Sequence, residues 1–434
     1  MIKNKFNAKE FKIKLTIVCS LLALVILSFF FAEKLEAFFG LNETYSANQV
    51  SADKINSADY KVVYLDVGQG NCTYIKLPDG KTALIDAGNT MYGSEIVEFL
   101  NNENVKSIDY LIATHADADH IGGFASVLES FEVKNIYRPF QIAGKETFSG
   151  FVPTESEDLA DVYLDFVEST NNRSKISKVT SEVYADFIDK IYNEHYFENG
   201  KKIFSKITVF YDGLKIIGEN YSFEFFAPLV RDEKVDLSLV CENTSGYATI
   251  GYGSTESNGN SAIFLFSCYG KTFMFTGDAP YKDGSFDTDK NEAFEELDFI
   301  NSLTADEKLL ISNVSVYLVG HHGSSHSSSK DLLEILNPEF AVISVGKNNN
   351  YGHPESDVID RIASTSRLKE DYLLQTDKVG NISFSSIGSK LCYSIEVYDV
   401  DKKLTISWYE LSLVMFLSTS YLIVLIKPKQ CNRV

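Results

Sequence analysis

The chain has 434 residues, of which 44% are hydrophobic and 23% are charged, and its formal net charge is −20. Its 24 tyrosines and 31 phenylalanines supply enough apolar surface to exclude a disordered chain. The negative charge counts against binding of long nucleic acids, which depends on basic side chains that neutralise phosphates. It does not exclude a metal site that handles one phosphodiester, because bound cations supply the local positive charge.

The N-terminal segment predicts a membrane anchor. Residues 15–32 form an uncharged apolar run, and five lysines precede it. A run of this length exceeds the apolar core of most signal peptides, so an uncleaved anchor is favoured over a cleaved leader. We therefore expect residues 1–34 to form a cytoplasmic tail with a transmembrane helix, and residues 35–58 to form a flexible stalk.

A second apolar run lies at residues 411–426 and is followed by Lys427, Lys429 and Arg433. It is shorter than the roughly 20 residues of a normal span, so a buried terminal helix is the alternative. Basic residues beyond both runs agree with two cytoplasmic ends. We therefore expect residues 406–434 to form a second transmembrane helix with a basic tail, and the part in between to lie outside the cytoplasmic membrane.

Between the two runs, short β-rich segments alternate with helical patterns, which predicts one mixed α/β domain over residues 59–405. Helices are expected at residues 94–101, with Ser94 as N-cap, and from residue 121 onward. Residues 141–211 are expected to be an insertion that caps or flanks a site, with helices at 158–167 and 181–192. Strands are expected at residues 62–67, 72–77 and 82–85 (an antiparallel meander), and at 110–114, 222–226, 262–267, 272–276, 314–319, 341–345 and 382–385.

Four possible metal ligands fall within six residues where a buried strand turns into a helix, namely His115, Asp117, Asp119 and His120. In an extended segment alternate side chains share a face, so the first three can converge, and His120 begins the next turn. Imidazole suits zinc, and carboxylate suits harder cations such as Mn²⁺. A polar loop without a ligand role would rarely gather these groups after an apolar strand, which predicts a metal site.

Two later strands end in the same chemistry. The strand at residues 272–276 leads to Asp278, whose two carboxylate oxygens could bridge two cations. The strand at residues 314–319 delivers His321 and His322 at its end. Each cluster alone is a weak signal, but three strand-end clusters in this order strongly favour a metal centre.

The segment from His115 to His120 resembles the His-x-His/Asp-x-Asp-His signature of the metallo-β-lactamase superfamily. The wider pattern resembles one branch, the extracytoplasmic domain of ComEC-type DNA-uptake proteins. The resemblance implies an αββα sandwich with an insertion and a site at one edge. The matching segments are residues 65–70, 84–88, 115–120, 275–278, 321–324, 351–354 and 375–380.

The resemblance also assigns ligands for two divalent ions, zinc or manganese. It implies that His115 and Asp117 hold one ion, that Asp119 and His120 hold the other, and that Asp278 bridges them. One of the two histidines at residues 321 and 322 would complete the second site. His321 is preferred because it directly follows the strand, although the sequence leaves the choice open.

Further roles follow from the matched segments. Asp86 and Asp66 would orient ligands, although Asp86 could equally be a turn carboxylate. Asp119 or Asp278 would orient the attacking water. His353 would contact a substrate phosphate or protonate the leaving group, with a plain surface role as the alternative. Asn260 and Ser324 are expected to contact substrate, and the serine run 324–329 could instead cap the following helix.

The chain departs from the family pattern in three places. The third imidazole commonly given to the first metal is absent, because residues 257–261 offer only amides and hydroxyls. Asn71 stands where the ComEC-type branch usually has Asp, and Asp117 stands where many superfamily members have His. The first site is therefore rich in oxygen, which favours Mn²⁺ at least as much as Zn²⁺.

These observations predict a membrane-anchored, extracytoplasmic binuclear hydrolase, with phosphodiesters as substrates and DNA as the first class to test. A cell-envelope phosphodiesterase that acts on teichoic acid or phosphorylcholine is the alternative, since it needs no basic groove. The non-enzymatic alternative is a DNA-uptake or binding component with an inert site. Two spans cannot enclose a pore, so transport would need a membrane channel partner.

Overall fold

The computed structural model describes residues 48–139, 142–143, 178–179, 181–210, 212–227, 234–236, 247–249, 257–281 and 296–395. All of them lie in one unit that spans Ala47–Tyr398. The apolar runs at residues 15–32 and 411–426 and the helix expected at residues 158–167 fall outside the described residues. Within the described part, no helix is both long and apolar enough to cross a bilayer.

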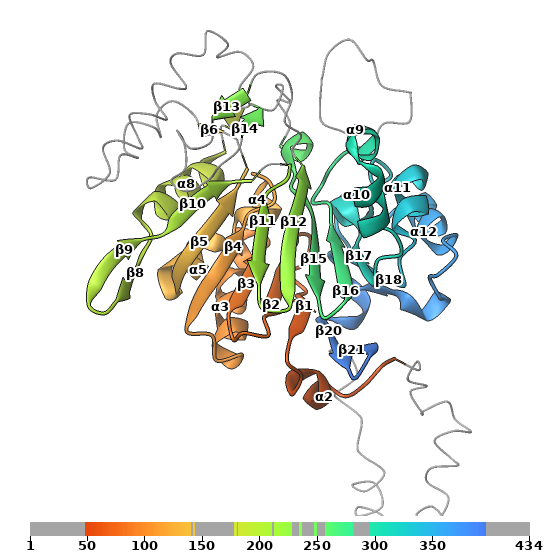
Figure 1. Ribbon diagram of the computed structural model, residues 1–434, viewed down its shortest axis with the longest axis horizontal. Helices are drawn as coiled ribbons and strands as arrows, with labels where there is room; N and C mark the ends of the chain where they lie inside the picture. Colours follow the sequence, from red (N-terminus) through yellow and green to blue (C-terminus); the bar gives the residue numbers. More distant parts are fainter. Residues whose placement is uncertain are drawn as a thin grey trace, which may run out of the picture. The chain divides into compact units, whose positions relative to one another are not determined.

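Two large mixed β-sheets form the middle of this unit (Figure 1). The first has eight strands in the order β10-β5-β4-β3-β2-β1-β20-β21. Strands β1, β2 and β3 form the expected antiparallel meander, and β3, β4, β5 and β10 run parallel. The bounds are β1 Lys61–Tyr64, β2 Thr73–Lys76, β3 Thr82–Ile85, β4 Ser107–Ile112, β5 Glu132–Arg138, β10 Lys206–Val209, β20 Ile382–Ile387 and β21 Lys390–Ile395.

The second sheet has seven strands in the order β11-β12-β15-β16-β17-β18-β19. Its first four strands are antiparallel, and β16 to β19 run parallel. Parallel neighbours need crossover connections, and helices supply them on the outer face. The bounds are β11 Lys215–Gly218, β12 Tyr221–Ala227, β15 Ile263–Cys268, β16 Lys271–Phe275, β17 Val316–Leu318, β18 Phe340–Ile343 and β19 Leu373–Gln375.

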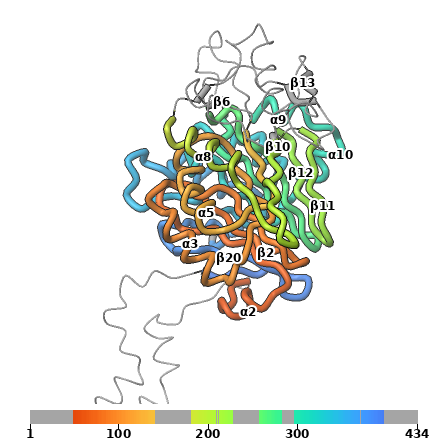
Figure 2. Tube along the Cα trace, turned by 90° about the vertical axis from the view of Figure 1, so that its left-hand side faces the viewer, coloured from red at the N-terminus to blue at the C-terminus, as the bar shows by residue number. Residues whose placement is uncertain are grey.

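Three apolar layers hold the sandwich together. In β1, Val62 and Tyr64 face the core between the sheets, whereas Val63 faces the outer layer, as the two-residue period of a strand requires. Helices α3 (Gly93–Asn102), α5 (Phe124–Ser130) and α8 (Glu182–Asn193) cover the outer face of the first sheet (Figure 2). The outer face of the second sheet carries α9 (Glu296–Ser302), α11 (Lys330–Leu336) and α12 (Ser356–Ala363). The αββα sandwich predicted from the sequence is therefore confirmed.

Aromatic rings fill much of the core between the sheets. Phe264 of β15 is fully buried between Phe275 and Phe225, with ring centroids 4.8 and 4.9 Å away. The two stacked pairs belong to three neighbouring strands of the second sheet. Such pairs stabilise a core beyond the area that they bury.

The predicted stalk and insertion are partly built into the sandwich. Residues 48–50 pair with β21, where the Val50 amide donates to the Tyr393 carbonyl at 2.8 Å, and Ile55 of α2 (Ala52–Asn56) is fully buried. The end of residues 35–58 is thus folded, because nonlocal pairing outweighs its polar composition. Likewise β10 extends the first sheet within residues 141–211, and α8 stacks Phe187 on Phe124 of α5. The apolar face of α8 explains why it joins the outer layer.

Helix α3 begins one residue before the expected N-cap. Ser94 lies inside it, and Tyr92 occupies the N-cap position without a side-chain cap. By contrast, Ser181 caps α8 and Ser329 caps α11, each accepting a backbone amide.

Glu194 ties the end of α8 to the first sheet. Its carboxylate accepts the Val133 amide at 3.1 Å, and its carbonyl accepts the Ser205 amide at 3.0 Å. Burial raises the pKa of Glu194 from its ordinary value of 4.5 to about 7. The folded chain therefore holds this proton more tightly than the unfolded chain does.

The substitution Phe264→Ala should lower the free energy of unfolding by about 3–5 kcal/mol, because it leaves a cavity between two rings. Urea denaturation of the full-length chain measures this loss. Phe197→Ala is the control, since Phe197 is 59% exposed in β8 (His195–Glu198) and its loss should stay within about 0.5 kcal/mol. Equal losses in the two variants would contradict the central position of Phe264.

The substitution Glu194→Gln should stabilise the fold at high pH and leave it unchanged at low pH. The wild-type chain loses stability as the pH rises from 4.5 through about 7, because the folded state must then bury a charge. Since the group is only half-buried, we expect a gain of about 1–2 kcal/mol above pH 8 for the Gln variant. Urea denaturation at several pH values tests this, and a pH-independent difference would refute it.

Candidate metal centre

Four strand ends meet at one edge of the sandwich. In the first sheet, Asp86 directly follows β3 and His115 follows β4. In the second sheet, Asp278 follows β16, and His321 and His322 follow β17. Because β3 runs parallel to β4 and β16 to β17, each sheet delivers its pair of loops to the same edge.

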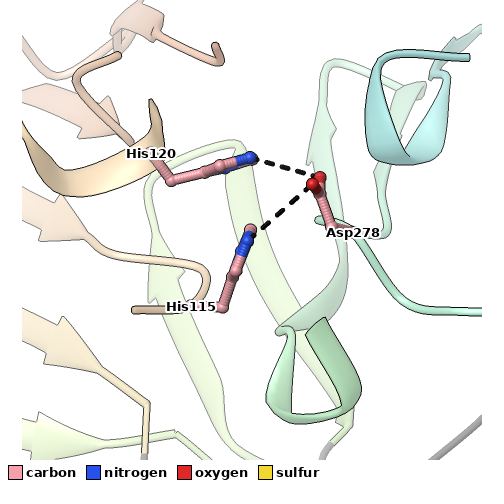
Figure 3. A group of neighbouring side chains, drawn as sticks. All are labelled: His115, His120 and Asp278. Carbon is pink, nitrogen blue, oxygen red and sulfur yellow. Dashed lines mark ion pairs between the residues drawn. The ribbon is translucent and has the colours of Figure 1, made fainter. Parts of the chain in front are cut away.

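His115, His120 and Asp278 form the innermost group of the site. The His120 Nε2 atom lies 3.2 Å from Asp278 Oδ1, and His115 Nε2 lies 3.8 Å from Asp278 Oδ2. Figure 3 shows both rings directed at the Asp278 carboxylate from the opposite side of the site. All three side chains are buried and close enough together to hold one ion.

Asp119, His120 and His322 form a second group of the same kind. The His322 Nε2 atom lies 3.4 Å from Asp119 Oδ2 and 3.7 Å from Asp278 Oδ2. Asp119 lies on the short helix α4 (Ala118–Ile121), so α4 places it beside His120. The two groups share His120, and Asp278 of the first group lies 3.7 Å from His322 of the second.

Several buried polar atoms of the site make no hydrogen bond of regular geometry, although the nearest two, His120 Nε2 and Asp278 Oδ1, lie 3.2 Å apart. They are Nε2 of His115, His120 and His322 and Oδ1 of Asp278. Buried polar atoms are nearly always paired, so such a cluster needs an explanation. Imidazole nitrogens and a carboxylate oxygen are donors for divalent cations, and the residues present therefore fit the two-metal site expected from the sequence.

Asp86 fixes His120 from behind. Its Oδ2 atom accepts the Nδ1 proton of His120 at 2.7 Å, and its Oδ1 atom accepts the Thr114 amide at 2.8 Å. The Thr114 hydroxyl donates to Asp86 Oδ2 at 2.7 Å and lies 3.1 Å from His115 Nδ1. Since the Nδ1 sides of both rings are occupied, their Nε2 lone pairs face the centre. Asp86 thus lies where an orienting residue is expected.

His322 is held by a backbone carbonyl. Its Nδ1 atom donates to the Ser344 oxygen at 2.9 Å, and its ring is buried, whereas the His321 ring is 27% exposed. His321 Nε2 lies 3.7 Å from Asp278 Oδ2, outside both three-residue groups. The geometry therefore favours His322 over the preferred His321. The position of His321 directly after the strand does not decide the choice, because both residues adopt left-handed backbone, with φ of 49° and 52°.

A buried polar network holds this strained turn. The Tyr317 hydroxyl accepts the Gly320 amide at 3.3 Å and lies 2.8 Å from Ser328 Oγ, and the Ser327 hydroxyl donates to the Gly320 carbonyl at 2.7 Å. The fully buried Glu296 accepts the amides of residues 328 and 329. Left-handed backbone persists only where the surroundings determine it, and this network does so.

Asp278 is fixed by its backbone. Its amide donates to the Ser261 hydroxyl at 3.1 Å, and Gly277 before it has a φ of 51°. A Cβ at Gly277 would lie 2.9 Å from the Ser261 side chain, so the turn requires glycine.

The oxygen-rich rim of the site contains Asp117. Its Oδ2 atom lies 3.9 Å from His115 Nε2, and its side chain is 43% exposed. Nearby, Ser257 Oγ and Asn258 Oδ1 are buried without a partner, in the segment that lacks the expected third imidazole. The backbone amide of Asn71, the residue at the position where Asp was expected, donates to the Asp119 carbonyl at 3.1 Å.

The other residues predicted to serve the site are His353, Ser324, Asn260 and Asp66. His353 is half-buried with an unpartnered Nδ1, and its ring centroid lies 5.7 Å from that of His321. Ser324 is buried, and its hydroxyl accepts the His326 amide within its own loop. Asn260 is buried next to Ser261. Asp66 accepts the Gly68 amide at 3.0 Å and so shapes the loop after β1.

Burial and neighbouring charges shift the pKa values of the site residues in opposite directions. Burial, followed by the positive charge of His120, lowers the pKa of His115 to about 4. Burial also opposes a charge on His120, but Asp278 and Asp86 outweigh it and raise the pKa of His120 well above its ordinary range. For Asp119 burial favours the neutral form, yet the adjacent His322 imidazole leads the effects that lower the pKa to about 2.

Sequence reasoning gave no role to Thr114, Ser261 or Ser344. These residues orient the ligands through a hydroxyl or a carbonyl group. Such groups are common throughout a protein sequence and therefore do not mark a site. The position of Thr114, directly before His115 at the end of an apolar strand, is the signal that could have singled it out.

Comparisons with known proteins agree with this architecture. The family model described as "Metallo-beta-lactamase superfamily" matches residues 65–347. ComE operon protein 3 of Bacillus subtilis (strain 168) is 24% identical over 345 residues, which cover 76% of this chain and 33% of that protein. Competence protein ComA of Neisseria gonorrhoeae is 24% identical over 324 residues, 74% of this chain and 32% of that protein.

The chain thus spans about a third of the length of these curated relatives, and the predicted resemblance to ComEC-type proteins is confirmed. Among solved structures, the metallo-beta-lactamase fold protein YhfI from Bacillus subtilis superposes with a TM-score of 0.35 at 9% identity. That alignment covers 73% of this chain and 95% of YhfI.

The substitution Asp86→Asn should weaken metal binding about 10- to 100-fold, the usual effect of removing a partner behind a metal-binding imidazole. An Asn still accepts the Thr114 amide through its oxygen, but its NH₂ group then faces His120 Nδ1 and turns the Nε2 atom into a donor. Competition with a chromophoric chelator measures the affinity for Zn²⁺ and Mn²⁺.

Asp109→Asn is the matched control for this test. Asp109 is also a buried carboxylate of the first sheet that accepts a backbone amide, from Thr82. It lies within β4, and its Oδ1 atom forms an ion pair with Lys134 at 2.9 Å. Equal metal affinity in Asp86→Asn and Asp109→Asn would contradict the orienting role of Asp86.

Proposed function

Because this chain belongs to the metallo-β-lactamase superfamily, we propose that it is a binuclear metal-dependent hydrolase that cleaves phosphodiesters, with DNA as the leading substrate class. The observation that carries the proposal is the cluster of buried, unpartnered nitrogen and oxygen atoms around Asp278. An inert domain would have no reason to keep such atoms together, since each one costs free energy when it stays unpaired.

We assign the first ion to His115, Asp117 and Asp278 and the second to Asp119, His120 and His322, with Asp278 shared. The distances from His115 Nε2 to Asp117 (3.9 Å) and Asp278 (3.8 Å), and from His322 Nε2 to Asp119 (3.4 Å), support this assignment. His120 is close enough to Asp278 to contribute to either ion. When bound, two divalent ions polarise the phosphoryl oxygens and lower the pKa of a water. Since the first site is oxygen-rich and lacks a third imidazole, Mn²⁺ suits it at least as well as Zn²⁺.

The protein's own groups would handle orientation and protons. Asp119, which is 28% exposed, has a carboxylate oxygen that can orient the attacking water. The His353 ring lies 5.7 Å from the His321 ring, and His353 would contact a phosphate oxygen or protonate the leaving oxygen. Asp86 and Ser344 would keep the imidazoles in the tautomer that the centre requires.

The DNA proposal rests on the ComEC-type relatives, two of which are named for competence or the ComE operon. The net charge of −20 favours a second candidate, a cell-envelope phosphodiesterase for teichoic acid or phosphorylcholine polymers, which needs no basic groove. A DNA-uptake component without catalysis is the third, and the unpartnered ligand cluster argues against it.

We also propose two membrane anchors and an extracytoplasmic domain between them. The apolar runs at residues 15–32 and 411–426, with basic residues beyond both, support two anchors and an extracytoplasmic position of residues 59–405. Two spans cannot line a pore, so any DNA transport would need a membrane channel partner. The curated relatives are about three times as long as the matched region, which leaves room for such a part in those proteins.

The full-length chain, stripped with chelator and reloaded with Mn²⁺ or Zn²⁺, should hydrolyse bis(p-nitrophenyl) phosphate and single-stranded DNA. Asp119→Asn should lower kcat at least about 100-fold, as expected when a charge aligned with the reacting groups is lost. Asp357→Asn, on the exposed face of α12, is the control and should keep full activity.

Each outcome separates the candidates. Turnover of the chromogenic diester without DNA cleavage would move the proposal to envelope polymers, which labelled teichoic acid fragments then test. Activity with Zn²⁺ alone would refute the preference for Mn²⁺. Tight metal binding with no hydrolysis of any of the three substrates would overturn the enzyme proposal.

A further inference from the structure

An aromatic side chain stands exposed beside the candidate site. Tyr351 is 71% exposed, although a tyrosine offers a large apolar ring that folding usually buries. It lies between β18 and α12, in the loop that also carries His353. A single exposed aromatic residue needs no explanation by itself, but this ring stacks on His353 and is held by its loop.

The ring is connected to the metal centre by a series of contacts. Tyr351 stacks on His353 with ring centroids 5.7 Å apart and an interplanar angle of 28°. His353 in turn meets the edge of His321 at 5.7 Å, and His321 Nε2 lies 3.7 Å from Asp278. One face of the tyrosine ring is therefore turned to the site through His353, and most of the side chain is open to solvent.

The loop that presents Tyr351 is held by Asn349. The Asn349 Oδ1 atom accepts the amides of Tyr351 and His353, each at 3.1 Å, and its Nδ2 group donates to the Gly346 carbonyl at 3.0 Å and the His353 carbonyl at 2.6 Å. The Gly346 amide donates to the Gln69 side chain at 3.2 Å, which docks the loop on the first sheet. A ring on a fixed loop loses little freedom when a ligand stacks on it.

An open flat ring beside a phosphodiester site suits a nucleobase. Bases stack on exposed aromatic rings in proteins that bind single strands, and each such contact contributes about 1–3 kcal/mol. A choline headgroup is the other candidate, but quaternary ammonium ions are usually recognised by cages of several aromatic rings. Tyr351 stacks on a single imidazole and is mostly exposed, which favours a planar ligand.

We propose that Tyr351, stacked on His353 and fixed by Asn349, is a platform for the base of a nucleotide whose phosphate occupies the metal centre. This inference rests on the proposed phosphodiesterase function and narrows its substrate to single-stranded nucleic acid. Bases in a duplex are already stacked on each other, so the platform selects against duplexes and needs no particular sequence. A stacking contact also gives affinity without a basic groove, which suits an acidic protein.

The test compares two variants of one residue on two ligands. Tyr351→Leu keeps the apolar bulk but removes the ring, and Tyr351→Phe keeps the ring. The ligands are a labelled single-stranded oligonucleotide and its analogue in which every nucleotide is abasic, so both carry the same backbone charge. For the binding assay the oligonucleotides carry phosphorothioate linkages, which slow hydrolysis. Fluorescence anisotropy then measures their binding to the metal-loaded full-length protein. Cleavage is measured in parallel with oligonucleotides that have normal phosphodiester linkages.

Tyr351→Leu should bind the normal oligonucleotide about 5- to 150-fold more weakly, which corresponds to the contribution of one stacked base. Its affinity for the abasic analogue should match wild type within about twofold, a difference of less than 0.5 kcal/mol. Tyr351→Phe should behave as wild type. Tyr269→Leu is the matched control, because Tyr269 is 48% exposed in the turn before β16, whereas Asp278 follows the end of that strand.

The outcomes separate this inference from the function on which it rests. If the wild-type protein binds and cleaves DNA but Tyr351→Leu has no effect, or weakens binding of both ligands equally, the platform is overturned. The proposed nuclease activity would then remain supported. Base-dependent binding without cleavage would keep the platform and overturn catalysis on DNA. A wild-type chain that neither binds nor cleaves either oligonucleotide would overturn both. Hydrolysis of a phosphorylcholine diester that depends on Tyr351, without DNA binding, would assign the ring to a cation instead.

Discussion

The buried carboxylate of Asp278 is the group on which the candidate site depends. Burying a charge without compensation costs several kcal/mol, and here imidazoles from both sheets surround it. His115 and His120 reach it from the first sheet, while Asp278 itself and His322 belong to the second. The attraction between these groups, and the cations that would complete it, join the two halves of the sandwich at the edge where both present their loops.

The chemistry of this edge could be read from the sequence because each ligand cluster follows an apolar strand. The strands ending before His115, Asp278 and His321 were predicted, and the parallel order that brings their ends together is the reason that the residues meet. The choice between His321 and His322 could not be predicted. It depends on two consecutive left-handed residues, and these depend on Tyr317 and Ser327 on either side of them and on Glu296 of the separate helix α9.

The αββα layers were predictable from the resemblance, but several elements were not predicted from their own residues. Strand β21 and helix α12 carry many polar residues; β21 pairs with β20, and Val358 and Ile362 of α12 join the outer layer of the second sheet. The predicted stalk shows the same limit. Its Ser- and Asn-rich composition indicates flexibility, yet Ile55 enters the core and residue Gln49 pairs with Tyr393, a partner more than three hundred positions away.

The pairing of residues 48–50 with β21 has a topological consequence. The chain enters the domain and leaves it along two adjacent backbone segments, joined by hydrogen bonds of 2.8 and 2.9 Å. A unit whose two ends emerge at one point can be carried within a loop of a larger protein without forcing that loop apart. The same sandwich can therefore serve as a module in proteins of very different length, as its match to about a third of each longer relative illustrates.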